Sequence, residues 1–160
     1  MAATYEPIAN VDVTNVTTTT FNSLGSYTDI IVVGAGLTRG TANSIFIRFN
    51  SDTGSNYSYT QLVGNGTAAS SSRQSNQTSI LVGAGTSGLS ATPTMFICQI
   101  QNFSNANTYK TILSRDTDSN GSTEAFVGLW RNTNAITSIT IFTGGDFTGG
   151  TLTLYGIASA

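Results

Sequence analysis

The chain of 160 residues contains no histidine and a single cysteine. Without histidine, Ser–His and Cys–His nucleophile pairs and histidine-ligated zinc sites are excluded. Cys98 cannot form a disulfide within the chain, and its position in the mostly apolar run Met95–Ile100 predicts a small buried side chain. We therefore expect a protein that is not an enzyme and that carries no cofactor.

Charged residues are also scarce, at 9% of the chain, against roughly a quarter in an average domain. The net charge is −2 and the six basic residues are scattered, so we expect no nucleic-acid binding. No apolar run approaches the roughly 18 residues that span a bilayer. The opening residues, MAATYEPIAN, lack the basic and apolar regions of a signal peptide. We expect no membrane association, and synthesis in the cytoplasm without an export signal.

Helix-forming residues such as Lys and Glu are few, and no segment of ten residues shows helical periodicity. Short β-branched or aromatic runs recur instead, with turn residues between them. In Ser44–Asn50, for example, three apolar residues alternate with Phe46 and Arg48, which is typical of a strand with one buried face. The expected strands are Val11–Phe21, Asp29–Val33, Ser44–Asn50, Tyr57–Val63, Thr78–Val82, Met95–Gln101, Thr111–Arg115, Ala125–Arg131, Ser138–Thr143 and Thr151–Ile157.

These strands predict an all-β fold, a single-domain antiparallel β-sandwich of jelly-roll type with about eight to ten strands and almost no helix. We expect residues 11–160 to form this domain and residues 1–10 to form either an extended N-terminal arm or the first strand. Two polar segments of low complexity, 64–77 and 83–93, predict long exposed loops.

Two sequence matches to catalytic or nucleotide-binding motifs have the wrong surroundings. Asp52-Thr53-Gly54-Ser55 matches the signature of aspartic proteases, but its flanks are polar and the chain has no second copy to supply the paired carboxylate. A turn that opens at Asp52, with Gly54 at positive φ, explains the same residues. Gly-Ala-Gly follows apolar strands at 34–36 and 83–85, but neither precedes the helix that a dinucleotide site requires.

The segment 116–124, DTDSNGSTE, is the best metal candidate in the sequence. Its first residues have the spacing of the first half of an oxygen-ligand calcium loop, but the twelfth position, which should be glutamate, is Val127. A polar hairpin around Asn-Gly is the alternative interpretation, and we favour it. The weak calcium candidates are Asp116, Asp118, Asn120 and Glu124.

Several stretches of the sequence, among them YTDIIVV, RFNSDTGSNYSYTQLVGNG, VGLWRNTNAITSITIF and GGTLTLYGI, resemble a family of small virion structural proteins of tailed bacteriophages, including cyanophages and other marine phages. The likeness covers the chain from Met1 to Ile157. It implies a jelly-roll sandwich that assembles as a homotrimer on the virion, as a capsid decoration (cement) protein or as a tail-fibre or baseplate domain. No site residues are carried over from the family.

Of these roles we expect decoration of the outer capsid surface, with the major capsid protein as partner, because the chain has no heptads or repeats that would build a fibre shaft. An N-terminal arm would contact a neighbouring protein through Tyr5, Pro7 and Ile8. The alternative is a tail component that binds host glycans through exposed aromatic residues, for which the candidates are Tyr57, Tyr59 and Trp130. Packing of these aromatics in the core or in a trimer interface is the competing interpretation.

Overall fold

The computed structural model describes residues 5–117 and 121–158, and in these residues every regular element is a β-strand. The all-β prediction is therefore confirmed. The described part of the chain has no helix that could cross a membrane. The strands are β1 (Glu6–Asp12), β2 (Thr18–Phe21), β3 (Asp29–Thr38), β4 (Ile45–Phe49), β5 (Tyr57–Gly64), β6 (Ala69–Gln77), β7 (Ile80–Gly83), β8 (Thr94–Ile100), β9 (Lys110–Thr117), β10 (Thr123–Trp130), β11 (Ile139–Phe142) and β12 (Gly149–Ile157).

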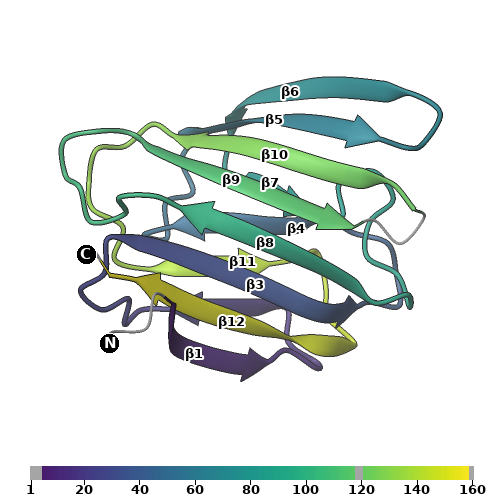
Figure 1. Ribbon diagram of the computed structural model, residues 1–160, viewed down its shortest axis with the longest axis horizontal. Coiled ribbons are helices and arrows are strands. Elements are labelled where there is room, and N and C mark those ends of the chain that lie inside the picture. Colours follow the sequence, from purple (N-terminus) through teal and green to yellow (C-terminus); the bar gives the residue numbers. More distant parts are fainter. Residues whose placement is uncertain (1–4, 118–120, 159–160) are drawn as a thin grey trace.

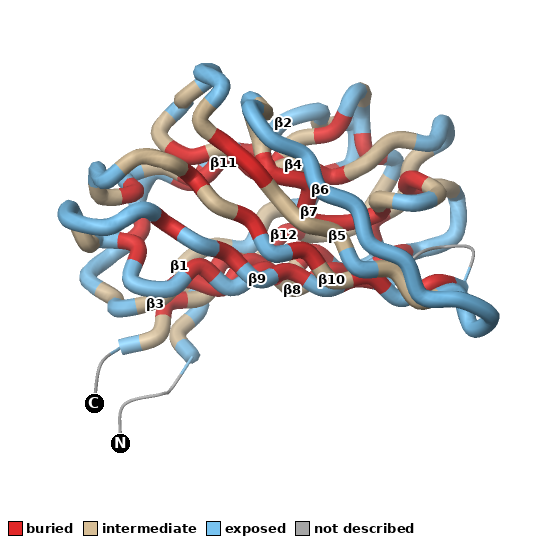
Figure 2. The backbone as a smooth tube through the Cα atoms, turned by 90° about the horizontal axis from the view of Figure 1, so that it is seen from above, coloured by how far each residue is buried: buried red, intermediate tan, exposed pale blue. Residues whose placement is uncertain are grey.

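The strands form two sheets in which all neighbouring pairs are antiparallel. The large sheet has the order β1-β12-β3-β8-β9-β10-β5-β6, and the small sheet has the order β2-β11-β4-β7. Figure 1 shows the large sheet in front, from β6 at the top to β1 at the bottom, with the small sheet behind it. The view from above shows the same two layers (Figure 2). The fold is a β-sandwich, and the jelly-roll topology stays a prediction.

The core lies between the two sheets because the strands alternate buried and exposed residues. In β9 every second residue, starting at Lys110, is buried, and in β10 the same alternation buries Phe126 and Trp130. At Gly128 the sheets approach so closely that an added Cβ would lie 2.5 Å from Ile80 Cγ2. Glycine at this position therefore lets β7 pack directly on the large sheet.

The aromatic centre of the core joins the two sheets. Trp130 is fully buried, its ring centroid 6.2 Å from that of Tyr57 and 5.6 Å from that of Phe49. The Tyr57 hydroxyl donates to the carbonyl oxygen of Phe49 at 3.2 Å, which links β5 in the large sheet to β4 in the small one. Burying each of these side chains contributes about 2 kcal/mol or more to folding.

The structure corrects some of the predicted strands. The segment Val11–Phe21 is two strands in different sheets, because the chain turns at Asn15, which has a φ of 62°. The segment 64–77 is exposed, as predicted, but only residues 65–68 form a loop, because Ala69–Gln77 is the strand β6, which pairs with β5 in a hairpin. These two differences account for the increase from the ten predicted ranges to the twelve strands found in residues 5–117 and 121–158.

The segment 83–93 is irregular after Gly83, as predicted, but it is not fully exposed. Ala84 and Leu89 are completely buried, and the Leu89 amide donates to the carbonyl oxygen of Asn43 at 2.8 Å. This segment is therefore part of the packed body of the domain.

The N-terminal residues from Glu6 onward form a strand of the domain. β1 pairs with β12 of the same chain, with an irregularity between Pro7 and Ala9. Residues 1–10 were expected to form either an extended arm or the first strand of the domain. From Glu6 onward, the described residues form a strand. Tyr5 is 52% exposed and Pro7 is exposed, whereas Ile8 packs partly against the core.

Candidate functional site on the outer face of the large sheet

The structure brings two of the calcium candidates together. Asp116 in β9 and Glu124 in β10 are directly opposite each other in the strand register, and both side chains are buried. Asp118 and Asn120 lie outside the described residues. Within residues 5–117 and 121–158, no group of three or more acidic, histidine or cysteine side chains could hold a metal ion.

The two carboxylates bind the Gly-Ala-Gly loop that follows β7. The Ala84 amide donates to Asp116 Oδ2, while the Gly85 and Thr86 amides donate to Glu124 Oε2 and Oε1 at 3.0 and 2.9 Å. Hydrogen bonds from neutral amides to a carboxylate are among the stronger ones in proteins. The acidic pair therefore positions a backbone loop, a role that its sequence spacing did not indicate.

Asp52 likewise has a structural role at the turn between β4 and β5. Its carboxylate accepts hydrogen bonds from the Gly54 amide at 2.8 Å, Asn56 Nδ2 at 2.9 Å and Trp130 Nε1 at 2.8 Å. Burial raises the pKa of Asp52, but these three hydrogen bonds and the nearby Arg48 charge outweigh it, so that the pKa lies below its ordinary value. The protease-like triplet is thus a turn that is anchored by the partly buried Asp52 carboxylate.

Two details of this turn differ from the prediction. The left-handed residues are Asn50 and Ser51, with φ values of 51° and 54°, and Gly54 is not among them. The Asp52 amide donates to the carbonyl oxygen of Phe49 at 2.9 Å, which closes the turn around Asn50 and Ser51. Asparagine tolerates this conformation better than most residues with a side chain.

The proposed glycan platform is wrong for two of its three aromatics. Tyr57 and Trp130 are completely buried in the core, and burial raises the pKa of Tyr57 to about 12. Tyr59 is half-buried and packs against the core. Tyr57 and Trp130 therefore have no ring face open to a sugar.

A different surface is open: the outer face of the large sheet, which no second layer covers. Four large apolar side chains on this face are about half exposed, namely Leu62 at 51%, Met95 at 49%, Leu113 at 49% and Val127 at 50%. Together with their partly buried apolar neighbours they form what we call the outer apolar patch. Its members are Val33, Leu62, Met95, Ile97, Leu113, Ala125, Val127 and Leu129.

The strand register makes this patch continuous. Leu113 is directly opposite Val127, and Leu62 is directly opposite Ala125. Side chains directly opposite on neighbouring antiparallel strands are in contact range. One charged residue, Arg115, lies between members of the patch. It is directly opposite Ile97 on one neighbouring strand and Ala125 on the other. The result is an apolar surface with a single positive charge inside it.

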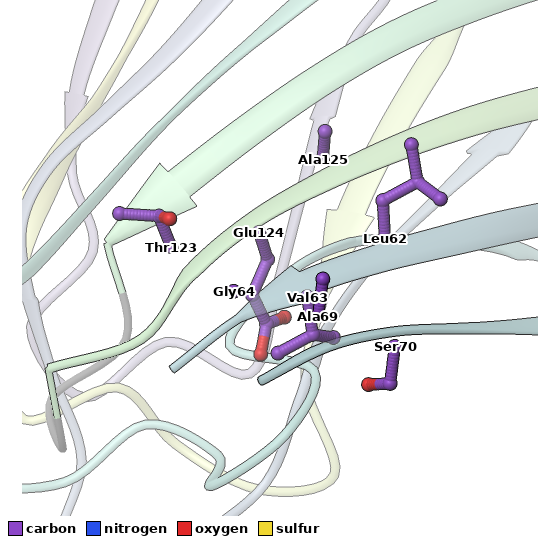
Figure 3. A pocket seen from close by; sticks show the side chains of 8 residues that line it. All are labelled: Leu62, Val63, Gly64, Ala69, Ser70, Thr123, Glu124 and Ala125. Carbon is purple, nitrogen blue, oxygen red and sulfur yellow. The ribbon is translucent and has the colours of Figure 1, made fainter. Parts of the chain in front are cut away.

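The patch is hollowed by shallow depressions. One of about 310 Å³ lies over β8, β9 and β10 and is lined in part by Gln99, Leu113 and Val127. Another of about 420 Å³ lies at the edge of the patch, where β10 meets the β5–β6 hairpin, and its lining combines Leu62 and Ala125 from the outer face with Glu124 from the inner face. Figure 3 shows Leu62 and Ala125 pointing to the same side of the sheet there, with the Glu124 carboxylate on the opposite side. A partner that fills these depressions would remove the exposed apolar surface from water.

This patch was not predicted from the sequence, although β10 contains a signal for it. The strand, TEAFVGLW, places Phe126 and Trp130 on the core face and Ala125, Val127 and Leu129 on the other. A strand that is apolar on both faces is expected where both faces are covered. In a sandwich of two layers, the second apolar face is therefore a candidate surface for a partner.

Comparison with known protein families and with curated proteins finds none that matches the chain. Among solved structures, an alginate lyase variant in complex with an alginate tetrasaccharide is 12% identical, with a TM-score of 0.31 over 94% of this chain and 81% of the other. A protein of unknown function from Shewanella oneidensis is 13% identical, with a TM-score of 0.21 over 84% and 60% of the two chains. Both likenesses are too weak to carry an argument.

Proposed function

We propose that the protein is a structural component of a tailed-bacteriophage virion, a capsid decoration protein. In this proposal it binds the outer head surface as a homotrimer and stabilises the contacts between capsomers of the major capsid protein. The resemblance of the sequence to small virion proteins supports the phage assignment and the trimer. The structural observation that carries the proposal is the outer apolar patch, a surface suited to docking on another protein.

The physical case for docking rests on the size and chemistry of the patch. Leu62, Met95, Leu113 and Val127 are each about half exposed. Burying apolar surface stabilises a complex by about 25 cal/mol per Å², before the cost of association is subtracted. Because the patch carries little charge beyond Arg115, its contact with a capsid surface would depend weakly on salt. A head offers many equivalent positions for such a contact.

The copy number of the protein in purified virions tests this proposal. Quantitative gel or mass-spectrometric analysis against the major capsid protein should give hundreds of copies per particle, because a decoration protein repeats over the head lattice. A dozen or fewer copies would place the protein in the tail and overturn the decoration role. Absence from purified virions would overturn the phage assignment as a whole.

A further inference from the structure

The loop of the β5–β6 hairpin begins with an asparagine that is followed directly by glycine. Residues 65–68 form this loop, and all of them are exposed. In Figure 1 the loop lies at the upper right corner of the molecule. Glycine has no side chain to shield the peptide nitrogen that it shares with the preceding residue. The side chain of Asn65 and the backbone nitrogen of Gly66 are therefore both open to water.

Backbone amides of the loop polarise the side-chain carbonyl of Asn65. Its Oδ1 accepts hydrogen bonds from the Thr67 amide at 3.0 Å and from the Ala68 amide at 2.8 Å. Two donors at these distances stabilise negative charge that develops on a carbonyl oxygen when its carbon is attacked. The loop thus supplies the donor arrangement of an oxyanion hole to its own asparagine.

A nucleophile for this carbonyl carbon lies in the next residue. Within residues 5–117 and 121–158, no hydrogen bond engages the Gly66 amide. An added Cβ at Gly66 would meet no atom within 4 Å, so the surroundings leave room for movement of this peptide group. Rotation about single bonds of Asn65 brings the Gly66 nitrogen towards Asn65 Cγ. Attack would close a five-membered ring, which is a favourable ring size.

We propose that Asn65 is a site of spontaneous deamidation in the folded protein, and that the amides of its own loop promote the reaction. The Gly66 nitrogen loses its proton to hydroxide and bonds to Asn65 Cγ, while negative charge develops on Oδ1, facing the two amide donors. The bond from Cγ to Nδ2 then breaks, and Nδ2 takes up a proton and leaves as ammonia. Water adds to either carbonyl of the resulting cyclic imide and opens it to aspartate or isoaspartate. One water is consumed and one ammonia is released.

Two other asparagines provide a comparison within the same chain. Asn105 Oδ1 and Asn132 Oδ1 each accept a hydrogen bond from the backbone amide two residues further on, at 2.6 and 2.9 Å. The residues that follow them are alanine and threonine, whose side chains crowd the attacking nitrogen. Asn65 combines a polarised carbonyl with an unshielded neighbouring nitrogen, so it should react before these two.

The products would change the end of the hairpin. Aspartate adds a negative charge, whereas isoaspartate also inserts the former side-chain methylene into the main chain. Gly64 and Ala69, which are paired next to the loop, would then lose their register. Both residues line the depression of about 420 Å³ at the edge of the outer apolar patch, so its shape would change with them. The inference goes beyond the proposed function and does not depend on it.

Peptide mapping of the full chain after incubation in mildly alkaline buffer tests the proposal. Trypsin places Asn65, Asn105, Asn132 and Asn120, which also precedes glycine, in separate peptides. Mass spectrometry detects the exchange of NH₂ for OH, and chromatography separates the aspartate from the isoaspartate peptide. Conversion is expected at Asn65, while Asn105 and Asn132 are the matched controls and should stay unchanged. No conversion at Asn65, or equally fast conversion at the two controls, would overturn the proposal.

The same incubation in guanidinium chloride shows whether the folded loop takes part. Unfolding removes the hydrogen bonds from Thr67 and Ala68 to Asn65 but leaves the Asn-Gly sequence intact. Asn65 should therefore convert several-fold faster in the native protein than in the unfolded one, because only the native loop holds both donors on Oδ1. Equal or slower conversion in the native protein would overturn the role assigned to the loop amides, and with it the proposal.

Discussion

At the turn between β4 and β5, the Asp52 carboxylate joins three separate donors. Gly54 and Asn56 belong to the turn itself, while Trp130 belongs to the end of β10. One side chain therefore fixes both the shape of the turn and the orientation of the largest aromatic residue in the core. Because the donors favour the charged form, the pKa of Asp52 lies below its ordinary value of 3.8.

Replacement of this carboxylate by an amide should destabilise the fold. Asparagine has one side-chain oxygen, so it cannot accept all three hydrogen bonds, and the buried indole N–H of Trp130 is weakened or left unpaired. We expect Asp52→Asn to lower the free energy of unfolding by about 1–2 kcal/mol at pH 7, measured by chemical denaturation. Asp12→Asn, whose exposed carboxylate accepts hydrogen bonds only from the amide and side chain of Thr14, is the control and should have a smaller effect.

The effect of Asp52→Asn should also depend on pH. A group whose pKa is lower in the folded than in the unfolded state stabilises the fold above its unfolded pKa, and this stabilisation disappears as the pH falls through the folded pKa. The difference between wild type and Asp52→Asn should thus be greatest above about pH 5 and shrink towards pH 2. A difference of the same size at pH 7 and pH 2.5 would contradict the assigned role of the charge.

At the scale of elements, the β5–β6 hairpin depends on its Asn-Gly turn. Asn65 Oδ1 accepts hydrogen bonds from the Thr67 and Ala68 amides at 3.0 and 2.8 Å. Gly66 has a φ of 82° and open space around its Cα. An added methyl group at Gly66 would therefore meet no atom, and its cost would come only from the backbone conformation.

Gly66→Ala should lower the free energy of unfolding by about 1 kcal/mol. Gly40→Ala is a matched control, because Gly40 also has open space around it but no left-handed φ. There the substitution should be neutral or slightly stabilising, since alanine restricts the unfolded chain. Thermal or chemical denaturation of the two variants gives the comparison, and equal effects at both positions would contradict the left-handed turn at Gly66.

This hairpin also shows how far the sequence could predict the elements. The Asn65-Gly66 turn was identifiable from local chemistry, because asparagine and glycine adopt left-handed conformations readily. β6 was not identifiable, because Ser, Asn and Gln have low strand propensity and a strand exposed on both faces shows no apolar alternation. Pairing with β5, a contact outside the segment itself, makes it a strand.

The candidate sites show the same division between local and distant contacts. The burial of Trp130 and Tyr57 follows the general tendency of large aromatics to lie in the core. The contact between the Asp116 and Glu124 pair and the loop after β7 joins segments more than thirty residues apart in the chain. No local pattern encodes that contact, so the same acidic residues suggested a metal loop when only their spacing was known.

For the whole molecule, the two faces of the large sheet differ in what covers them. The inner face builds the core with the small sheet, while the outer face carries the outer apolar patch and ends at the uncovered strand β6. The alternation within β9 and β10 allowed this second face to be predicted in principle. What fixes its extent is the register across neighbouring strands, which brings Leu62, Leu113 and Val127 onto adjoining strands of one surface.

We propose that the outer apolar patch binds the phage head. Binding of the purified protein to phage heads that lack this protein tests the proposal most directly. Val127→Lys should bind at least tenfold more weakly than wild type, because it places a charge at a contact with apolar neighbours. Thr18→Lys, an exposed position in the small sheet, should bind like wild type. Wild-type binding by Val127→Lys, or equal loss in both variants, would contradict the account.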